Sequence, residues 1–254
     1  MKFMFVVSTQ RLKQWLIVCT ALLLALGIVY SERDAIAVIS DGNQTPQAIY
    51  KIDTKEKKIA LTFDISWGET RATPILDVLK DKKVTKATFF LSSPWSLRHP
   101  DIVKRIKGDG FEIGSHGHNH ENYSKYSDEE IRSQIGKADN ILQELLGKKP
   151  TLIRMPNGDF DKRVLRIANN MGYTVIQWDT DSKDWMNPGV DAIVNNVLSK
   201  AHPGDIVLLH ASDSCKETHL ALPKIIDKLR ADGYEFVTVS ELIAGSQVKT
   251  KELN

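Results

Sequence analysis

The chain has 254 residues, of which 42% are apolar and 26% are charged, a composition that excludes a disordered, collagen-like or polytopic membrane protein. Thirty-four Lys and Arg stand against 32 Asp and Glu, so we expect no nucleic-acid partner, because such a surface needs clustered positive charge. The two cysteines, Cys19 and Cys215, are too few for a disulfide scaffold in a chain of this length.

Residues 1–37 have the pattern of a targeting segment. The run 15–30, WLIVCTALLLALGIVY, carries no charge and follows Lys2, Arg11 and Lys13, the arrangement that sends the following chain across a membrane. Its 16 residues fall short of the roughly 20 that span a bilayer, and Ala37 ends a candidate signal-peptidase site. A cleaved signal peptide and an uncleaved membrane anchor both stay open. Either one predicts an extracytoplasmic protein, secreted or membrane-anchored. A buried core helix fits less well, because the run has no polar face.

Residues 38–54 are polar and contain Gly42, Asn43 and Pro46, which predicts a linker. We expect one folded domain over 55–244 and a polar tail over 245–254 that frays. Removing the targeting segment leaves a length that suits one barrel without a second domain.

Short β-branched or aromatic runs alternate with longer amphipathic runs throughout the domain. The runs predict strands at 59–63, 87–91, 112–115, 151–154, 173–178, 205–209 and 235–237. They predict helices at 73–80, 102–109, 128–146, 162–170, 190–200 and 221–232. Ser127 and Glu130 form a capping-box signature before the longest helix. Alternation of this kind indicates parallel βαβ units and favours a closed or nearly closed barrel over an open sheet.

Polar side chains follow the predicted strands at the point where each one ends. These residues are Asp64, His116, Arg154, Asp179, Asp181 and His210. Because the carboxyl ends of parallel strands share one face, we expect these side chains to form a site there.

Three histidines fall within residues 116–120. Imidazoles four residues apart at a helix start project to one side, so His116 and His120 could share a divalent metal, whereas His118 would point elsewhere. The alternative is a solvated histidine cluster in a loop.

Asp64 could take a proton from a metal-bound water as a general base, although an isolated Asp is often a helix cap or a salt-bridge partner. Arg154 could hold that carboxylate by a bidentate contact and keep it ionised. His210 could protonate a leaving amine from across the site.

Taken together, these residues resemble the NodB-type polysaccharide deacetylases of carbohydrate esterase family 4. Five family motifs have counterparts in order along the chain, at residues 62–65, 116–120, 154–158, 181–185 and 208–210. Residues 65–68, 187–189 and 210–213 are similar to the PdaB-type subgroup associated with sporulation. The resemblance implies a distorted (β/α)7 barrel that N-deacetylates N-acetylated amino sugars in peptidoglycan or chitin-like glycan.

The resemblance also implies roles for individual residues. Asp64 matches the base, His210 the acid, Arg154 the residue that positions the base, and Asp181 a carboxylate that tunes the catalytic histidine. His116 and His120 match metal ligands, for zinc first and cobalt or nickel as alternatives. The positions that match the substrate groove are Asn157, Asp184, Trp185 and Trp67, and the partner implied is an N-acetylated glycan polymer bound by a monomer.

The chain departs from the family where a second aspartate normally supplies the third metal ligand, because that position is Ile65. Ser66, Glu69 or His118 could complete the metal site, or two histidines could hold the metal weakly in a slow enzyme. Alternatively, hydrolysis is lost and the domain binds glycan or acts structurally in spore formation. We favour a deacetylase, since the fold itself is expected to need neither the base, the acid nor the arginine. A membrane-tethered metal-storage protein that uses only the histidines is a third hypothesis.

Overall fold

The structure is a computed structural model that describes residues 47–245 and 247–251. The predicted targeting segment, with Cys19, lies outside the described residues. Within the described part, no helix is long and apolar enough to cross a membrane.

Seven parallel strands form the body of the sheet, in the order β6-β5-β4-β3-β2-β8-β7. They are β2 (Lys58–Ile65), β3 (Thr88–Leu91), β4 (Glu112–Ser115), β5 (Leu152–Ile153), β6 (Thr174–Ile176), β7 (Thr180–Asp181) and β8 (Asp205–His210). A further strand, β1 (Ala48–Asp53), runs parallel to β6 and meets β8 at the residue pair Lys51 and Asp205. This contact closes the sheet, so the predicted distorted (β/α)7 barrel is confirmed.

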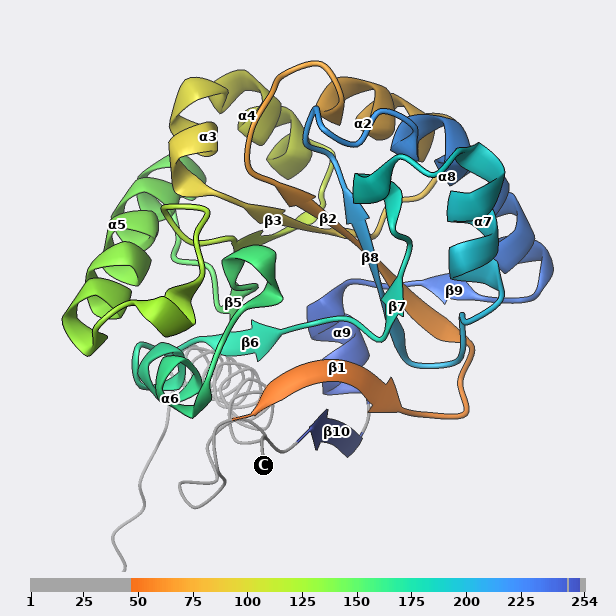
Figure 1. Cartoon of the computed structure of the whole chain (residues 1–254). Helices are drawn as coiled ribbons and strands as arrows, with labels where there is room; N and C mark the ends of the chain where they lie inside the picture. The colour runs from red at the N-terminus through yellow and green to blue at the C-terminus, as the bar shows by residue number, and fades with distance from the viewer. Residues whose placement is uncertain (1–46, 246, 252–254) are drawn as a thin grey trace, which may run out of the picture. The chain divides into compact units, whose positions relative to one another are not determined.

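Most of the helices cover the outside of the barrel, whereas the last helix packs against apolar residues of its interior such as Ile176 and Ile206 (Figure 1). The helices are α2 (Ala72–Asp81), α3 (Ser93–Arg98), α4 (Pro100–Gly108), α5 (Asp128–Leu146), α6 (Lys162–Asn170), α7 (Val190–Leu198), α8 (Thr218–Ala231) and α9 (Val239–Ala244). Single 3-10 turns occur at η1 (Tyr123–Lys125), η2 (Pro156–Gly158) and η3 (Asp184–Met186). The predicted capping box opens α5, where the Ser127 hydroxyl accepts from the Glu130 amide and the Glu130 carboxylate accepts from the Ser127 amide.

Strand β2 shows how the sheet separates its two faces. Successive side chains of a strand point to opposite faces. Leu61, Phe63 and Ile65 therefore pack in the apolar layer beneath the helices, whereas Thr62 and Asp64 meet Arg154 inside the barrel. The alternation continues through Ile65 because β2 extends to that residue.

The ends of the domain differ from the sequence prediction. The predicted linker contains β1, which joins the sheet from residue 48 onward. The predicted polar tail contains β10 (Gln247–Lys251), which pairs antiparallel with β1. The remaining short strand, β9 (Glu235–Phe236), pairs with β2. The sheet therefore begins and ends outside the predicted range 55–244.

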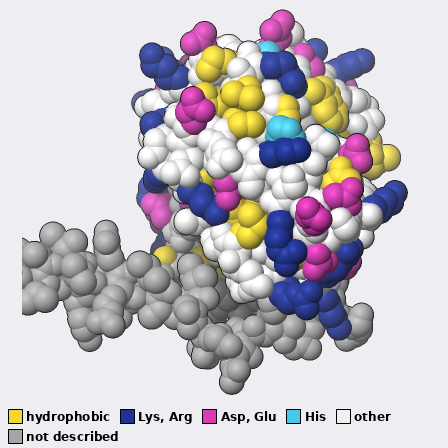
Figure 2. Space-filling model, turned by 90° about the vertical axis from the view of Figure 1, so that its left-hand side faces the viewer, with side chains coloured by type: hydrophobic (Ala, Val, Ile, Leu, Met, Phe, Trp, Pro, Cys, Tyr) yellow, Lys and Arg dark blue, Asp and Glu magenta, His cyan; other side chains and the backbone are white. Residues whose placement is uncertain are grey.

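The outer surface mixes charges of both signs. Figure 2 shows Lys and Arg interspersed with Asp and Glu, and apolar side chains between them, on the face it displays. On the surface of α5 and α6, for example, Arg163 lies 3.4 Å from Asp128. The described face offers no single-sign platform to a charged polymer.

Candidate active site

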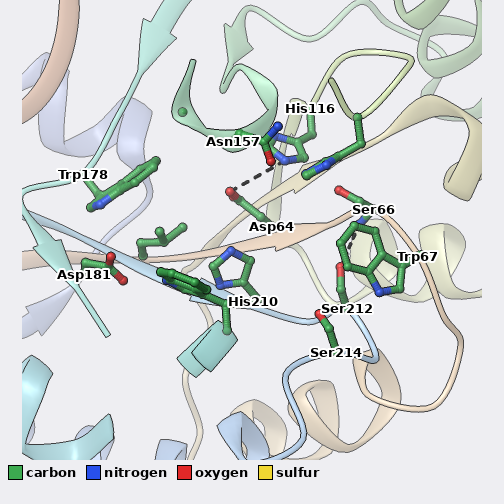
Figure 3. A pocket seen from close by; sticks show the side chains of 14 residues that line it. Asp64, Ser66, Trp67, His116, Asn157, Trp178, Asp181, His210, Ser212 and Ser214 are labelled. Carbon is green, nitrogen blue, oxygen red and sulfur yellow. Dashed lines mark hydrogen bonds and ion pairs between the residues drawn. The ribbon is translucent and has the colours of Figure 1, made fainter. Parts of the chain in front are cut away.

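A cavity of about 450 Å³ opens at the carboxyl ends of the strands. Asp64 and His210 project into it from β2 and β8, where they are direct partners in the parallel register (Figure 3). From the sequence we expect His210 across the site from Asp64, but the two lie side by side on neighbouring strands. Other lining residues are Ser66, Trp67, His116, His120, Asn157, Gly158, Trp178, Asp181, Trp185, Leu208, Ser212 and Ser214.

Arg154 anchors Asp64 from inside the barrel. Its guanidinium is fully buried and donates from one nitrogen to Asp64 Oδ1 and Thr62 Oγ1, both at 2.8 Å. The second nitrogen donates to the Gln177 carbonyl at 2.9 Å. The predicted bidentate contact is therefore corrected to a single one, because the fork is shared among three acceptors.

The charge of Asp64 follows from this contact. Burial by itself raises the pKa of the Asp64 carboxyl, but Arg154, with help from His116 and His210, outweighs burial and holds that pKa below its usual value. The carboxylate is consequently ionised at neutral pH and can accept a proton.

Two neutral imidazoles stand beside Asp64. His116 is buried, and its Nδ1 lies 2.8 Å from the Arg154 carbonyl. Since a carbonyl only accepts, Nδ1 carries the proton and Nε2 keeps a free lone pair. Burial lowers the pKa of His116 to about 4 and also lowers that of His120. The two rings are 5.4 Å apart between centroids, so both can present neutral nitrogen to one divalent cation.

His210 is held by Asp184 rather than by Asp181. Asp184 Oδ1 lies 2.7 Å from His210 Nδ1, and Oδ2 accepts from the His210 amide and the Thr218 hydroxyl. Burial lowers the pKa of His210, but the Asp184 carboxylate outweighs burial, and the pKa lies above its usual value. The prediction that placed Asp184 in the groove is wrong because this carboxylate is fully buried. Asp181 lines the cavity and adds a weaker charge attraction.

Ile65 does not reach the cavity. Its side chain is fully buried in the apolar layer outside the barrel, which is the face that its position in β2 dictates. The chain therefore presents no metal ligand at position 65, and the isoleucine stabilises the apolar layer instead.

The three residues that could replace Ile65 as a third metal ligand lie in different places. Ser66 lines the cavity, Glu69 is exposed, and His118 hydrogen-bonds the Ser93 hydroxyl through Nδ1 at 2.8 Å. Two groups of three metal-ligating side chains with closely spaced atoms occur in the described part of the chain, and neither contains His116 or His120. The donors present fit a cation held by two imidazoles and otherwise by water.

The rim of the cavity is aromatic. Trp67 is 45% exposed and Trp185 is 51% exposed, so each offers a ring face to a ligand. The Trp67 ring meets the His120 ring edge-on, with centroids 5.3 Å apart. Asn157 lines the same cavity in a left-handed conformation, with φ of 58°, and its amide donates to Asn122.

Arg154 and Asp64 contribute to the fold more than the sequence suggests. The Arg154 guanidinium stacks over Phe90 at 4.3 Å and has no solvent contact. Removing Asp64 would leave that buried charge uncompensated, which is strongly destabilising. We therefore expect the fold to depend on both the base and the arginine, in contrast to the expectation from sequence.

Comparison with known proteins now identifies the family. A family model described as polysaccharide deacetylase matches residues 51–176. Peptidoglycan-N-acetylglucosamine deacetylase of Bacillus cereus is 39% identical over 202 residues, which cover 78% of this chain and 94% of that protein. The chain belongs to the polysaccharide deacetylases of carbohydrate esterase family 4.

Relatives within this family differ in activity. Peptidoglycan-N-acetylmuramic acid deacetylase PdaA of Bacillus subtilis is 30% identical, over 81% of this chain and 79% of that one. A wild-type family 4 pseudoenzyme from Bacillus anthracis matches with a TM-score of 0.74 and 33% identity, over 80% of this chain and 70% of that chain. A mutant of that pseudoenzyme, with restored enzymatic activity, matches with the same TM-score and 34% identity, over 80% and 73%.

One positioning residue of the site, Asp213, was not predicted from the sequence. Asp213 accepts from the backbone amides of Glu69, Thr70 and Arg71 and so fixes the loop that carries Trp67. A carboxylate three residues after His210 was visible in the sequence, but nothing local shows that it crosses to the loop after β2.

Proposed function

We propose that this polysaccharide deacetylase removes acetyl groups from N-acetylated amino sugars of cell-wall glycan, peptidoglycan above all. One observation carries the proposal. Asp64 and His210 are register partners on β2 and β8, each has its own buried charge partner, and both open into one cavity. The Bacillus cereus relative, a peptidoglycan-N-acetylglucosamine deacetylase, and the Bacillus subtilis relative, a peptidoglycan-N-acetylmuramic acid deacetylase, support the same substrate class.

Asp64 and His210 divide the proton transfers of amide hydrolysis between them. Asp64 accepts the proton of the water whose oxygen attacks the acetyl carbon. His210 donates through Nε2 to the nitrogen as the C–N bond breaks, because Nδ1 is occupied by Asp184. The products are acetate and a free amine. Exchange of protons with water afterwards restores the ionised Asp64 and the charged His210.

A divalent metal fits beside Asp64, with His116 and His120 as its protein ligands. When bound, the metal is a Lewis acid that lowers the pKa of water. This matters here because a carboxylate with a lowered pKa is a weak base towards ordinary water. We infer zinc first, with cobalt or nickel as alternatives. Two protein ligands are fewer than the three typical of catalytic zinc, so the metal is weakly held and turnover is slow.

The groove binds sugar through its aromatic rim. Trp67 and Trp185 provide flat apolar faces on which pyranose rings can stack, and both are about half exposed. Asn157 and Asp181 supply polar groups on the cavity wall. We further propose that the domain is a monomer that works outside the cytoplasm, secreted or anchored by its N-terminal segment. The role in sporulation rests on resemblance to the PdaB-type subgroup.

A second candidate function is glycan binding without turnover. Two observations favour it: Ile65 lies in the apolar layer, and a pseudoenzyme is among the structural relatives. In that case the cavity and its aromatic rim are retained while the metal is not.

Acetate release separates the two candidates. The purified chain is incubated with N-acetylated peptidoglycan and zinc, cobalt or nickel, and acetate is quantified. We expect release with at least one metal and its loss in Asp64→Asn and His210→Ala. Asp227→Asn, which removes only an exposed ion pair with Lys82, serves as the control. Glycan binding without acetate release in all three metals would establish the second candidate instead.

A further inference from the structure

A second cluster of ligating side chains lies at the other end of β8 from His210. Asp205 is the first residue of β8, His202 precedes it in the same loop, and Asp179 lies between β6 and β7. The cluster lies where β1 and β8 close the barrel, because Asp205 forms the residue pair by which β8 meets β1. We call this place the seam of the barrel.

The backbone fixes this loop before any ligand arrives. The Gly204 amide donates to the Lys58 carbonyl, and the Gly204 carbonyl accepts from the Ile52 amide, both at 2.8 Å. Gly204 has a φ of +80°, and a Cβ there would lie 1.9 Å from the Ile52 carbonyl oxygen. Only glycine fits, so His202 and Asp205 are held on either side of a rigid turn.

One carboxylate oxygen in the cluster lacks a hydrogen bond. Asp205 is fully buried, and its Oδ2 accepts from the Thr180 hydroxyl at 2.6 Å. Its Oδ1 has no hydrogen-bond partner within the described part of the chain. Burial raises the pKa of Asp205 to about 6. An unsatisfied buried oxygen is unfavourable and calls for a bound group that supplies positive charge.

The other donors face that oxygen. His202 Nδ1 lies 2.9 Å from the Pro203 carbonyl, so Nδ1 carries the proton and Nε2 is the ligating atom. Nε2 lies 2.8 Å from Asp179 Oδ2 and 4.0 Å from Asp205 Oδ1. Ligands of a tetrahedral zinc ion are about 3.4 Å apart, as follows from metal–ligand distances of about 2.1 Å. The two separations bracket that value.

We propose that Asp179, His202 and Asp205 bind a divalent transition metal, zinc above all, at a structural site distinct from the catalytic cavity. The metal connects the segment before β7 to the start of β8, at the seam where a single residue pair joins β1 and β8. Imidazole and carboxylate are the ligand types that zinc accepts in such sites. A further side chain beside the cluster, Lys51, lies 2.7 Å from Asp179 Oδ2 and competes with the metal. Its side chain is 42% exposed, and a surface ion pair of this kind contributes little to stability, so Lys51 can turn into solvent.

The test removes the active-site ligands first. In the full chain carrying His116→Ala and His120→Ala, bound zinc is counted by equilibrium dialysis, and the midpoint of thermal unfolding is followed with and without zinc. We expect one zinc per chain and a higher midpoint with zinc. Asp205→Asn, which keeps an acceptor for Thr180, weakens zinc affinity at least tenfold. Lys51→Met strengthens affinity, because it removes the competing ammonium.

Matched variants keep the test decisive. Asp191→Asn, at an exposed pair with Lys224, leaves zinc binding unchanged. Should Asp205→Asn fail to fold, Asp179→Asn on the exposed side of the cluster replaces it. Absence of bound zinc overturns the proposal and makes His202 a plain ion-pair partner. Equal affinity with and without the Asp205 carboxylate also overturns it, because the zinc then binds without Asp205.

Discussion

Asp64 and Asp184 are buried carboxylates that serve neighbouring residues in different ways. Asp64 faces the cavity and is kept ionised by Arg154. Asp184 has no solvent contact and gives both oxygens to His210 and Thr218. The first carboxylate can exchange a proton with a ligand, whereas the second can only orient and charge the histidine beside it.

Asp184→Asn is expected to reduce acetate release by about 10- to 100-fold, because His210 loses orientation and charge stabilisation as the acid. The acid must be protonated, so activity falls as the pH rises through the His210 pKa. Removing the carboxylate lowers that pKa, and the alkaline limb of the pH–rate profile moves to lower pH. Asp181→Asn, whose attraction is weaker, moves the limb less. An unshifted limb in Asp184→Asn would show that His210 is not the acid.

Ile65→Asp is expected to lower the free energy of unfolding by about 2–4 kcal/mol in metal-free buffer, since it places a carboxyl in an apolar layer. Ile65→Val, the volume control, costs about 1 kcal/mol. Urea unfolding gives both values, and equilibrium dialysis should show no gain in metal affinity. Metal binding strengthened tenfold at unchanged stability would mean that residue 65 faces the cavity.

Most of the candidate site could be predicted from residues at strand ends, because parallel strands bring their carboxyl ends together. The carboxylate partner of His210 could not be predicted in this way. Asp181 and Asp184 are three residues apart, and the 3-10 turn that starts at Asp184 turns its side chain under β8. Similarly, no pattern in residues 62–65 shows that β2 continues one residue past Asp64.

At the scale of the elements, the sequence predicts a helix or strand correctly where the whole signal lies within a few consecutive residues. The capping box of Ser127 and Glu130 predicted the start of α5, which begins at Asp128 as expected. By contrast, the sequence predicts a linker where β1 lies, because the partners of this strand, β6 and β10, are distant in sequence. Strand β7 has only two residues, and strand formation there depends on its pairing with β8.

Across the whole molecule, Arg154 joins three parts of the barrel. It follows β5, bonds Thr62 and Asp64 on β2, and reaches the carbonyl that follows β6 at Gln177. A charge network therefore holds the interior of the barrel near the carboxyl ends of the strands. Towards the other end, apolar side chains such as Ile176 and Ile206 fill the interior.

Arg154→Leu is expected to lower the free energy of unfolding by about 3–5 kcal/mol, because it leaves the Asp64 charge buried without its partner. Arg166→Leu, on the surface, should change stability by less than about 0.5 kcal/mol. Denaturant titration measures both. A double variant with Asp64→Asn should lose less than the sum of the two single losses, and strict additivity would contradict the coupling.

The burial of Arg154 has a consequence for how this lineage can change. If the proposed deacetylation were lost, selection would still keep Asp64, because we expect the folded barrel to need a carboxylate beside the buried guanidinium. Drift would begin at Trp67 and Trp185, whose rings are about half exposed on the rim. The state of the rim, rather than survival of the base, is the better record of whether sugar still passes through the groove.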